Sequence, residues 1–167
     1  MKKARIKDLE KTYGIILECS DWLKSKGIKQ WNPPYPKNLF EKDIKDGNVY
    51  YFSKNGKLCG TCTLSKNPPF YYPAGLRNLQ KHEIYISRLA VSRGLKGRGI
   101  GKKLLHEIES YCKSNGIRKI KLDAIKSNKF LHEYYSSVGF NKIKEFKPLK
   151  IRNRKFDPAV LMEKRLG

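Results

Sequence analysis

Apolar residues in the first third of the chain recur three to four positions apart. This spacing runs from about residue 8 to residue 26 and stops at Gly27, which predicts a first helix. Three prolines in the segment 31–36 then exclude a continuing helix, because proline removes a backbone donor and fixes φ. A shorter helix is expected over residues 38–46.

The rest of the chain alternates between strand and helix patterns. The turn Asn55-Gly56 separates two strand-like runs and predicts a β-hairpin, since Asn-Gly suits the tightest hairpin turns. A strand, a helix and a strand in succession imply a parallel pair set in an otherwise antiparallel sheet. We therefore expect an α/β (α+β) fold with a mixed, mostly antiparallel sheet of about six to seven strands and about four helices. The predicted strands are 49–52, 58–64, 83–91, 117–122, 140–146 and 156–164, and the two later helices start at residues 100 and 128.

The length and composition indicate one globular domain. The chain has 167 residues, of which 39% are hydrophobic, and residues 1–167 are expected to form a single unit with one core. The first residues are too polar for a signal peptide, and no later run is apolar enough to span a membrane. We expect a soluble, cytoplasmic protein.

The charge is strongly positive. The sequence contains 37 Lys and Arg against 15 Asp and Glu, a net charge of +22. Such a field attracts nucleic acid and phosphate-rich cofactors alike, and the basic residues are spread along the chain without a recognised nucleic-acid motif. Non-specific nucleic-acid binding is compatible with this charge, whereas specific binding and membrane binding are not expected.

Four cysteines are expected to be free thiols. Cys59 and Cys62 have the CxxC spacing of zinc and redox sites, but they lie in a predicted strand, where residues three apart point to opposite faces. No second CxxC completes a zinc site, so no metal is expected.

A glycine-rich turn carries the clearest chemical signal. Four glycines fall within eight residues of the segment Arg93–Leu104, between a predicted strand and a predicted helix. Backbone amides at such a turn, together with the helix N-terminus, can hold phosphate oxygens, and Lys96, Arg98, Lys102 and Lys103 add positive charge. This pattern favours anion binding.

Two common phosphate motifs are excluded by spacing. A P-loop requires glycine where Lys96 stands and Ser or Thr where Lys103 stands. A dinucleotide fingerprint requires GxGxxG, and Leu104 occupies the position of its last glycine.

The chain resembles the GNAT superfamily of N-acetyltransferases. Its segment Lys96-Gly97-Arg98-Gly99-Ile100-Gly101, after Leu89-Ala90-Val91, is similar to the family's motif A. Asn128, Leu131, Tyr134, Tyr135 and Gly139-Phe140 are similar to motif B. Lys96 stands where the family has Gln or Arg, and Leu131 where it has a small Ala.

The resemblance implies an acyltransferase that uses acetyl-coenzyme A as cosubstrate, with the GNAT-like sheet and helices described above. It implies that Tyr135 protonates the departing thiolate. Candidates for the base that accepts the amine proton are Glu83 and His82, with a water chain as the alternative. The implied cofactor-binding residues are Leu89, Ala90, Val91, Lys96, Gly97, Arg98, Gly99, Ile100, Gly101, Lys102, Asn128 and Tyr135.

The acceptor is expected to be a primary amine of a small molecule or peptide. Trp31, Tyr35 and Tyr72, with Phe70 and Tyr71, fall in the two loops that flank the acceptor side in this family, which implies a partly aromatic pocket. A net charge of +22 disfavours polycationic acceptors. The sequence leaves open a homodimer. It also leaves open a non-catalytic module that binds acetyl-coenzyme A, nucleic acid or the ribosome.

Overall fold

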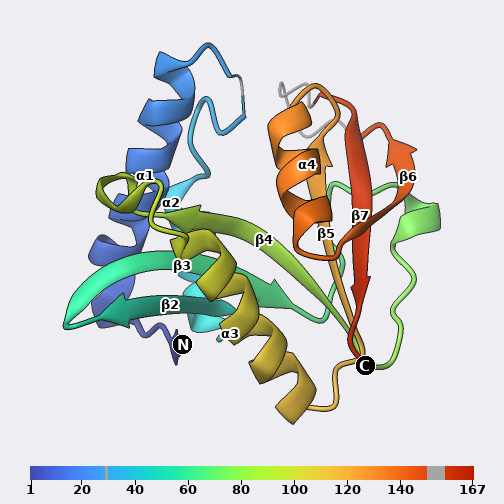
Figure 1. Ribbon diagram of the computed structural model, residues 1–167, viewed down its shortest axis with the longest axis horizontal. Coiled ribbons are helices and arrows are strands. Elements are labelled where there is room, and N and C mark those ends of the chain that lie inside the picture. The colour runs from blue at the N-terminus through green and yellow to red at the C-terminus, as the bar shows by residue number, and fades with distance from the viewer. Residues whose placement is uncertain (29, 150–156) are drawn as a thin grey trace. The chain divides into compact units, whose positions relative to one another are not determined.

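The computed structural model describes residues 1–28, 30–149 and 157–167 (Figure 1). Among these residues, no helix combines the length and apolar character that a membrane crossing requires. The helices are α1 Leu9–Ser25, α2 Lys37–Lys45, α3 Ile100–Ser114 and α4 Lys129–Ser137. The strands are β1 Lys2–Lys3, β2 Val49–Lys54, β3 Lys57–Ser65, β4 Glu83–Val91, β5 Lys119–Ile125, β6 Asn141–Phe146 and β7 Ala159–Arg165.

The strands are hydrogen-bonded in the order β1-β2-β3-β4-β5-β7-β6. Four pairs, β1–β2, β2–β3, β5–β7 and β6–β7, are antiparallel, whereas β4 and β5 are parallel, as expected for strands joined by a crossover helix. This confirms the predicted fold class. The two-residue strand β1 was not predicted, and β5 begins two residues later than predicted. Residue 156 of the last predicted strand lies outside the described residues.

Internal contacts divide the chain into two units. Unit 1 comprises residues 1–64 and 88–108, and unit 2 comprises residues 65–87 and 109–167. Both β4 and α3 contribute residues to each unit. The prediction of a single domain stays a prediction.

The core of unit 1 forms between the first helices and the hairpin. Ile16, Phe40 and Val49 are fully buried there, and the rings of Tyr13 and Phe40 lie 5.7 Å apart. The hairpin turn has φ of 50° at Asn55 and 74° at Gly56, the conformation that the Asn-Gly pair was expected to adopt.

The core of unit 2 is largely aromatic. Tyr72 packs edge-on against Phe146 at 4.8 Å and against Tyr85 at 6.0 Å, and Ala159 and Leu161 complete the cluster. Tilted contacts of this kind add to the free energy gained by burying the rings.

All four cysteines are free and buried, which confirms the prediction. Cys59 and Cys62 belong to β3, where they serve as small core side chains.

Gly60 permits the close approach of neighbouring segments within unit 1. A Cβ at this position would lie 2.5 Å from Cδ1 of Leu104 and 2.7 Å from the backbone oxygen of Ala90. Leu104 can rotate away, but the backbone oxygen cannot move without shifting its strand.

We expect Gly60→Ala to lower the free energy of unfolding by about 1 to 3 kcal/mol, because overpacking against backbone forces a shift. Chemical denaturation measures this. The control is Gly75→Ala, where a Cβ meets nothing within 4 Å. Equal stability of the two variants would show that the approach at Gly60 is not tight.

Candidate functional site

The turn from β4 into α3, in unit 1, depends on two glycines with positive φ. After the 3₁₀ turn Arg93–Leu95, φ is 78° at Gly97 and 67° at Gly99. A Cβ at either position would meet nothing within 4 Å, so glycine is favoured here by the backbone conformation rather than by crowding. The space above this turn is open to a ligand.

The turn presents a group of unpaired backbone donors. Lys103 N reaches Gly99 O at 3.2 Å and begins the helical hydrogen-bond ladder. The first amides of any helix have no acceptor within it, and α3, with 15 residues, is long enough to carry a positive N-terminal dipole. These donors can hold an anion. Five amides of the turn and the first turn of α3 have no backbone acceptor in the described chain: those of Gly97, Gly99, Ile100, Gly101 and Lys102.

Helix α1 holds the start of this turn. Glu18 accepts hydrogen bonds from the Arg93 amide at 2.6 Å and from the Ser92 hydroxyl at 3.2 Å. The Arg93 guanidinium lies over the Trp22 ring, 3.8 Å from its centroid, and the Lys96 ammonium lies 5.5 Å from it. Sequence reasoning missed Glu18 because it lies 75 residues before the amide it binds.

The four predicted cations lie next to the unpaired amides in the sequence. Lys96, Arg98, Lys102 and Lys103 are exposed, and in the described part of the chain none forms an ion pair with a carboxylate. Their charges are therefore available to a phosphate group at this turn.

The end of β4 lies beyond its parallel ladder with β5. The described ladder pairs Glu83–Tyr85 with Lys119–Lys121 and continues no further. Ala90 is buried, whereas Leu89 and Val91 are half-buried. The Val91 carbonyl accepts a weak hydrogen bond from the Cys19 thiol at 3.3 Å. The role of Leu89–Val91 in cofactor binding stays a prediction.

Arg88, which precedes this segment, is fixed on several sides within unit 1. Its φ is 51°, and its guanidinium pairs with Asp43 at 2.9 Å, donates to Thr63 at 3.1 Å and stacks over the Tyr35 ring at 4.2 Å. Tyr35 also donates to Asp43 at 3.1 Å, and burial raises the pKa of Tyr35 to about 12. Burial raises the pKa of Asp43 as well, although Arg88 opposes this. Tyr35, which was predicted to line the pocket for the amine substrate, is thus held in place by Arg88 and Asp43.

The prediction that Tyr72 lines the acceptor pocket is wrong. Its side chain is fully buried in the core of unit 2, and its hydroxyl donates to Asp123 at 2.9 Å, beside the Tyr71 hydroxyl at 2.8 Å. Asp123 therefore braces the loop that carries both tyrosines. Trp31, in unit 1, is half-buried and packs against the core there.

Tyr135 and Asn128 lie on α4 and at its start, in unit 2. Asn128 caps the helix, its side chain accepting from the Leu131 amide at 3.2 Å. Tyr135 is 8% exposed and packs against the Phe140 ring at 5.8 Å. Burial raises its pKa well above the usual tyrosine value, so the hydroxyl keeps its proton at neutral pH. Within the described residues this hydroxyl forms no hydrogen bond, which leaves its proton available.

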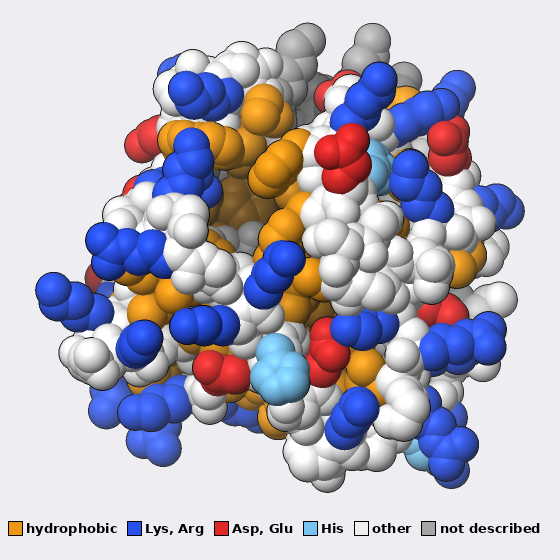
Figure 2. All heavy atoms as spheres, viewed as in Figure 1, with side chains coloured by type: hydrophobic (Ala, Val, Ile, Leu, Met, Phe, Trp, Pro, Cys, Tyr) orange, Lys and Arg blue, Asp and Glu red, His pale blue; other side chains and the backbone are white. Residues whose placement is uncertain are grey.

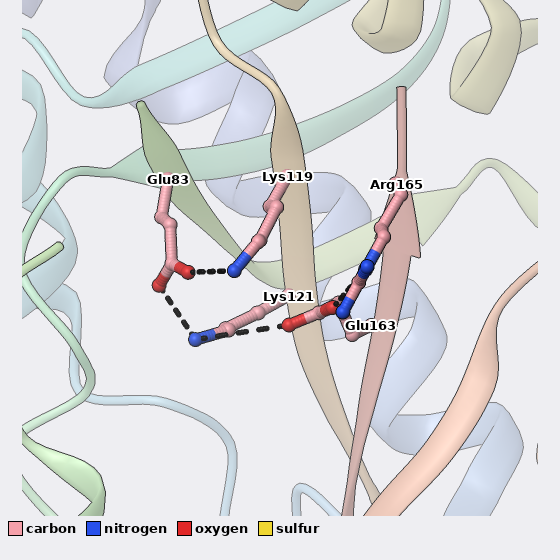
Figure 3. Close-up of polar contacts among 5 residues, drawn as sticks. All are labelled: Glu83, Lys119, Lys121, Glu163 and Arg165. Carbon is pink, nitrogen blue, oxygen red and sulfur yellow. Dashed lines mark hydrogen bonds and ion pairs between the residues drawn. The ribbon is translucent and has the colours of Figure 1, made fainter. Parts of the chain in front are cut away.

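Glu83 is the most buried member of an ion-pair cluster in unit 2 (Figure 3). It is 3% exposed and binds Lys119 at 3.0 Å and Lys121 at 2.5 Å; Lys121 also faces Glu163 at 3.9 Å. Burial raises the pKa of Glu83, but the hydrogen bonds from the two lysines outweigh it and hold the pKa below its usual value. A carboxylate held in this way is a poor proton acceptor, so the geometry disfavours Glu83 as the base.

Comparison with known proteins identifies the family. The model of the acetyltransferase (GNAT) family matches residues 16–140. The chain belongs to this family. An uncharacterized N-acetyltransferase of Bacillus subtilis, YesJ, is 30% identical over 142 residues, which cover 80% of this chain and 76% of YesJ. Acetyl transfer by a GNAT fold is thereby confirmed as the general activity.

Solved GNAT structures share the fold. A GNAT acetyltransferase of Listeria monocytogenes aligns with a TM-score of 0.77 and 24% identity, covering 99% of this chain and 93% of its own. The PaiA N-acetyltransferase of Thermoplasma acidophilum, solved in complex with coenzyme A, aligns with a TM-score of 0.67 and 20% identity, covering 98% and 96%.

The Glu83 cluster predicts a pH-dependent contribution to stability. The pKa of Glu83 in the folded protein lies below its ordinary value of 4.5, so its stabilising effect is present at neutral pH. It is lost as the pH falls through the folded pKa. We expect Glu83→Gln to lower the free energy of unfolding by about 2 kcal/mol at about pH 7, and by much less at about pH 3.

Chemical denaturation of both proteins at the two pH values measures this difference. Glu145→Gln, which removes an exposed carboxylate paired with Lys126, is the control and should change little. A Glu83→Gln effect that does not depend on pH would contradict the assignment.

Proposed function

We propose that this GNAT protein transfers the acetyl group of acetyl-coenzyme A to a primary amine of a small molecule or peptide. The observation that carries the proposal is the set of unpaired amides at the β4–α3 turn. They fit the pyrophosphate of the cosubstrate, with Lys96, Arg98 and Lys102 around it. The coenzyme A complex of PaiA supports the same choice of cosubstrate.

In the proposed reaction the neutral amine attacks the thioester carbonyl carbon. A C–N bond forms, the C–S bond breaks, and the sulfur leaves with the bonding electron pair. The Tyr135 hydroxyl gives its proton to this thiolate, and the amine loses one proton to water, because Glu83 is held by its two lysines. Tyr135 then recovers a proton from solvent, so that the products are the acetylated amine and coenzyme A.

We expect Tyr135→Phe to lower kcat about a hundredfold or more, because general acid catalysis contributes on this scale. The Kd for acetyl-coenzyme A should not change, since the ring and its packing are kept. Release of free thiol in the presence of a panel of primary amines measures kcat, and calorimetry measures the Kd.

Tyr134→Phe is the matched control. The Tyr134 hydroxyl is buried without a partner in the described structure, so its removal should leave both constants unchanged. Equal kcat for the Tyr135 variant and the original protein would make Tyr135 a structural residue.

A second prediction concerns the acceptor. We propose that Trp31 contacts the amine substrate, as its half-buried position in a loop of unit 1 allows. Trp31→Ala should raise KM for the acceptor about tenfold with the Kd for acetyl-coenzyme A unchanged. Trp31→Phe should restore most of the affinity by keeping an aromatic surface. An unchanged acceptor KM in the Ala variant would exclude Trp31 from the acceptor site.

A further inference from the structure

Unit 2 contains a hollow between α4 and β6. None of the residues assigned to acetyl transfer lines it. Its volume is about 500 Å³. Figure 2 shows Lys or Arg side chains, with acidic side chains among them, over this part of the visible face, where Figure 1 places α4 and β6. The lining residues are Lys126, Lys129, His132, Glu133, Lys142, Ile143, Lys144, Glu145 and Val160.

The lining carries an excess of positive charge. Four lysines and two glutamates give a formal net charge of +2. Glu145 is neutralised by Lys126 at 2.6 Å, whereas the other three lysines form no ion pair within the described residues. The charges that remain available favour an anion.

A bulge brings successive residues of β6 to the same hollow. In a regular strand, neighbouring side chains point to opposite faces, yet all four residues Lys142–Glu145 line this space. The ladder with β7 shifts register between Lys142 and Lys144, so Ile143 is an extra residue without a partner. Bulges of this kind redirect side chains at binding sites.

His132 supplies a buried polar atom without a partner. It is 5% exposed, and its Nε2 lies 2.9 Å from the Ile125 carbonyl oxygen. A carbonyl oxygen only accepts, so Nε2 carries a hydrogen, and in the neutral ring Nδ1 is an acceptor. Within the described chain Nδ1 is buried and has no hydrogen-bond partner. An unpaired buried acceptor is costly and favours a ligand that can donate to it.

We propose that the hollow between α4 and β6 binds a phosphate group. Lys129, Lys142 and Lys144 donate to the phosphate oxygens, and the hydroxyl of the monohydrogen phosphate donates to His132 Nδ1. The inference is independent of the acetyl transfer reaction, because it uses none of the residues assigned to it.

The test is a titration with inorganic phosphate at fixed ionic strength, in the absence of acetyl-coenzyme A. The ring nitrogens of His132 are followed by NMR, and His132→Gln assigns their signals among the three histidines. We expect a saturable shift of Nδ1. Sulfate carries the same charge as monohydrogen phosphate but has no hydroxyl, so it should bind about tenfold more weakly.

Two pairs of variants separate a defined site from bulk charge. Lys142→Thr with Lys144→Thr should weaken phosphate binding about tenfold or more. Lys54→Thr with Lys57→Thr removes the same charge from exposed strand positions in unit 1 and should leave the affinity unchanged. Equal weakening by both pairs, or a shift that does not saturate, would overturn the proposal.

A parallel titration with methyl phosphate identifies the source of the phosphate group. The dianion of methyl phosphate has no hydroxyl, so it should bind about tenfold more weakly than inorganic phosphate, as sulfate does, which assigns the hollow to free phosphate. Binding as tight as that of inorganic phosphate would contradict the hydrogen bond to His132 Nδ1. A failure of either titration leaves the acetyl transfer reaction unaffected, because that reaction is measured separately by thiol release.

Discussion

The first amides of α3 and those of the turn before it have no backbone acceptor in the described chain, and the proposed chemistry depends on this constraint. Glycine at positions 97 and 99 adopts the positive φ that turns the chain out of β4. Glu18 satisfies the amide of Arg93 at the start of the turn and leaves the later donors free. A net charge of +22 attracts any anion, whereas this turn provides donors in fixed directions, which is why we propose it as the site of the cosubstrate's phosphates.

Carboxylates are scarce in this chain, and those near the predicted functional residues already have partners. Glu18 holds the glycine turn, Asp43 holds Arg88, Asp123 holds two tyrosines and Glu83 holds two lysines. Each of them organises the structure around it. A carboxylate in such a role would lose these contacts on accepting a proton, which is why we assign the amine proton to water.

Periodicity and turn chemistry sufficed to predict the helices, the hairpin and the mixed sheet, because these depend on residues close together in sequence. The functional predictions that failed depend on long-range contacts. Tyr72 looked like its loop neighbours Phe70 and Tyr71, and only its burial against Tyr85 and Phe146 shows that it belongs to the core. Glu83 was a candidate for the base, and only the two lysines beside it show that its carboxylate is already bound.

The sequence pattern also could not show that His132 is buried. It sits among exposed charged residues of a helix, and its burial follows from the contact with Ile125. The cofactor residues from Lys96 to Lys102 and at Asn128 rest on motif spacing, and their roles stay predictions. So do the cytoplasmic location and the homodimer.

The most direct test of the central claim is calorimetric titration of the protein with acetyl-coenzyme A at physiological salt. Gly99→Glu serves as the comparison, because it places a carboxylate and a strained backbone where the phosphates are proposed to bind. The account predicts saturable binding near one equivalent, lost in the variant. Absence of binding, or equal binding by both proteins, would contradict the claim that the β4–α3 turn holds the cosubstrate.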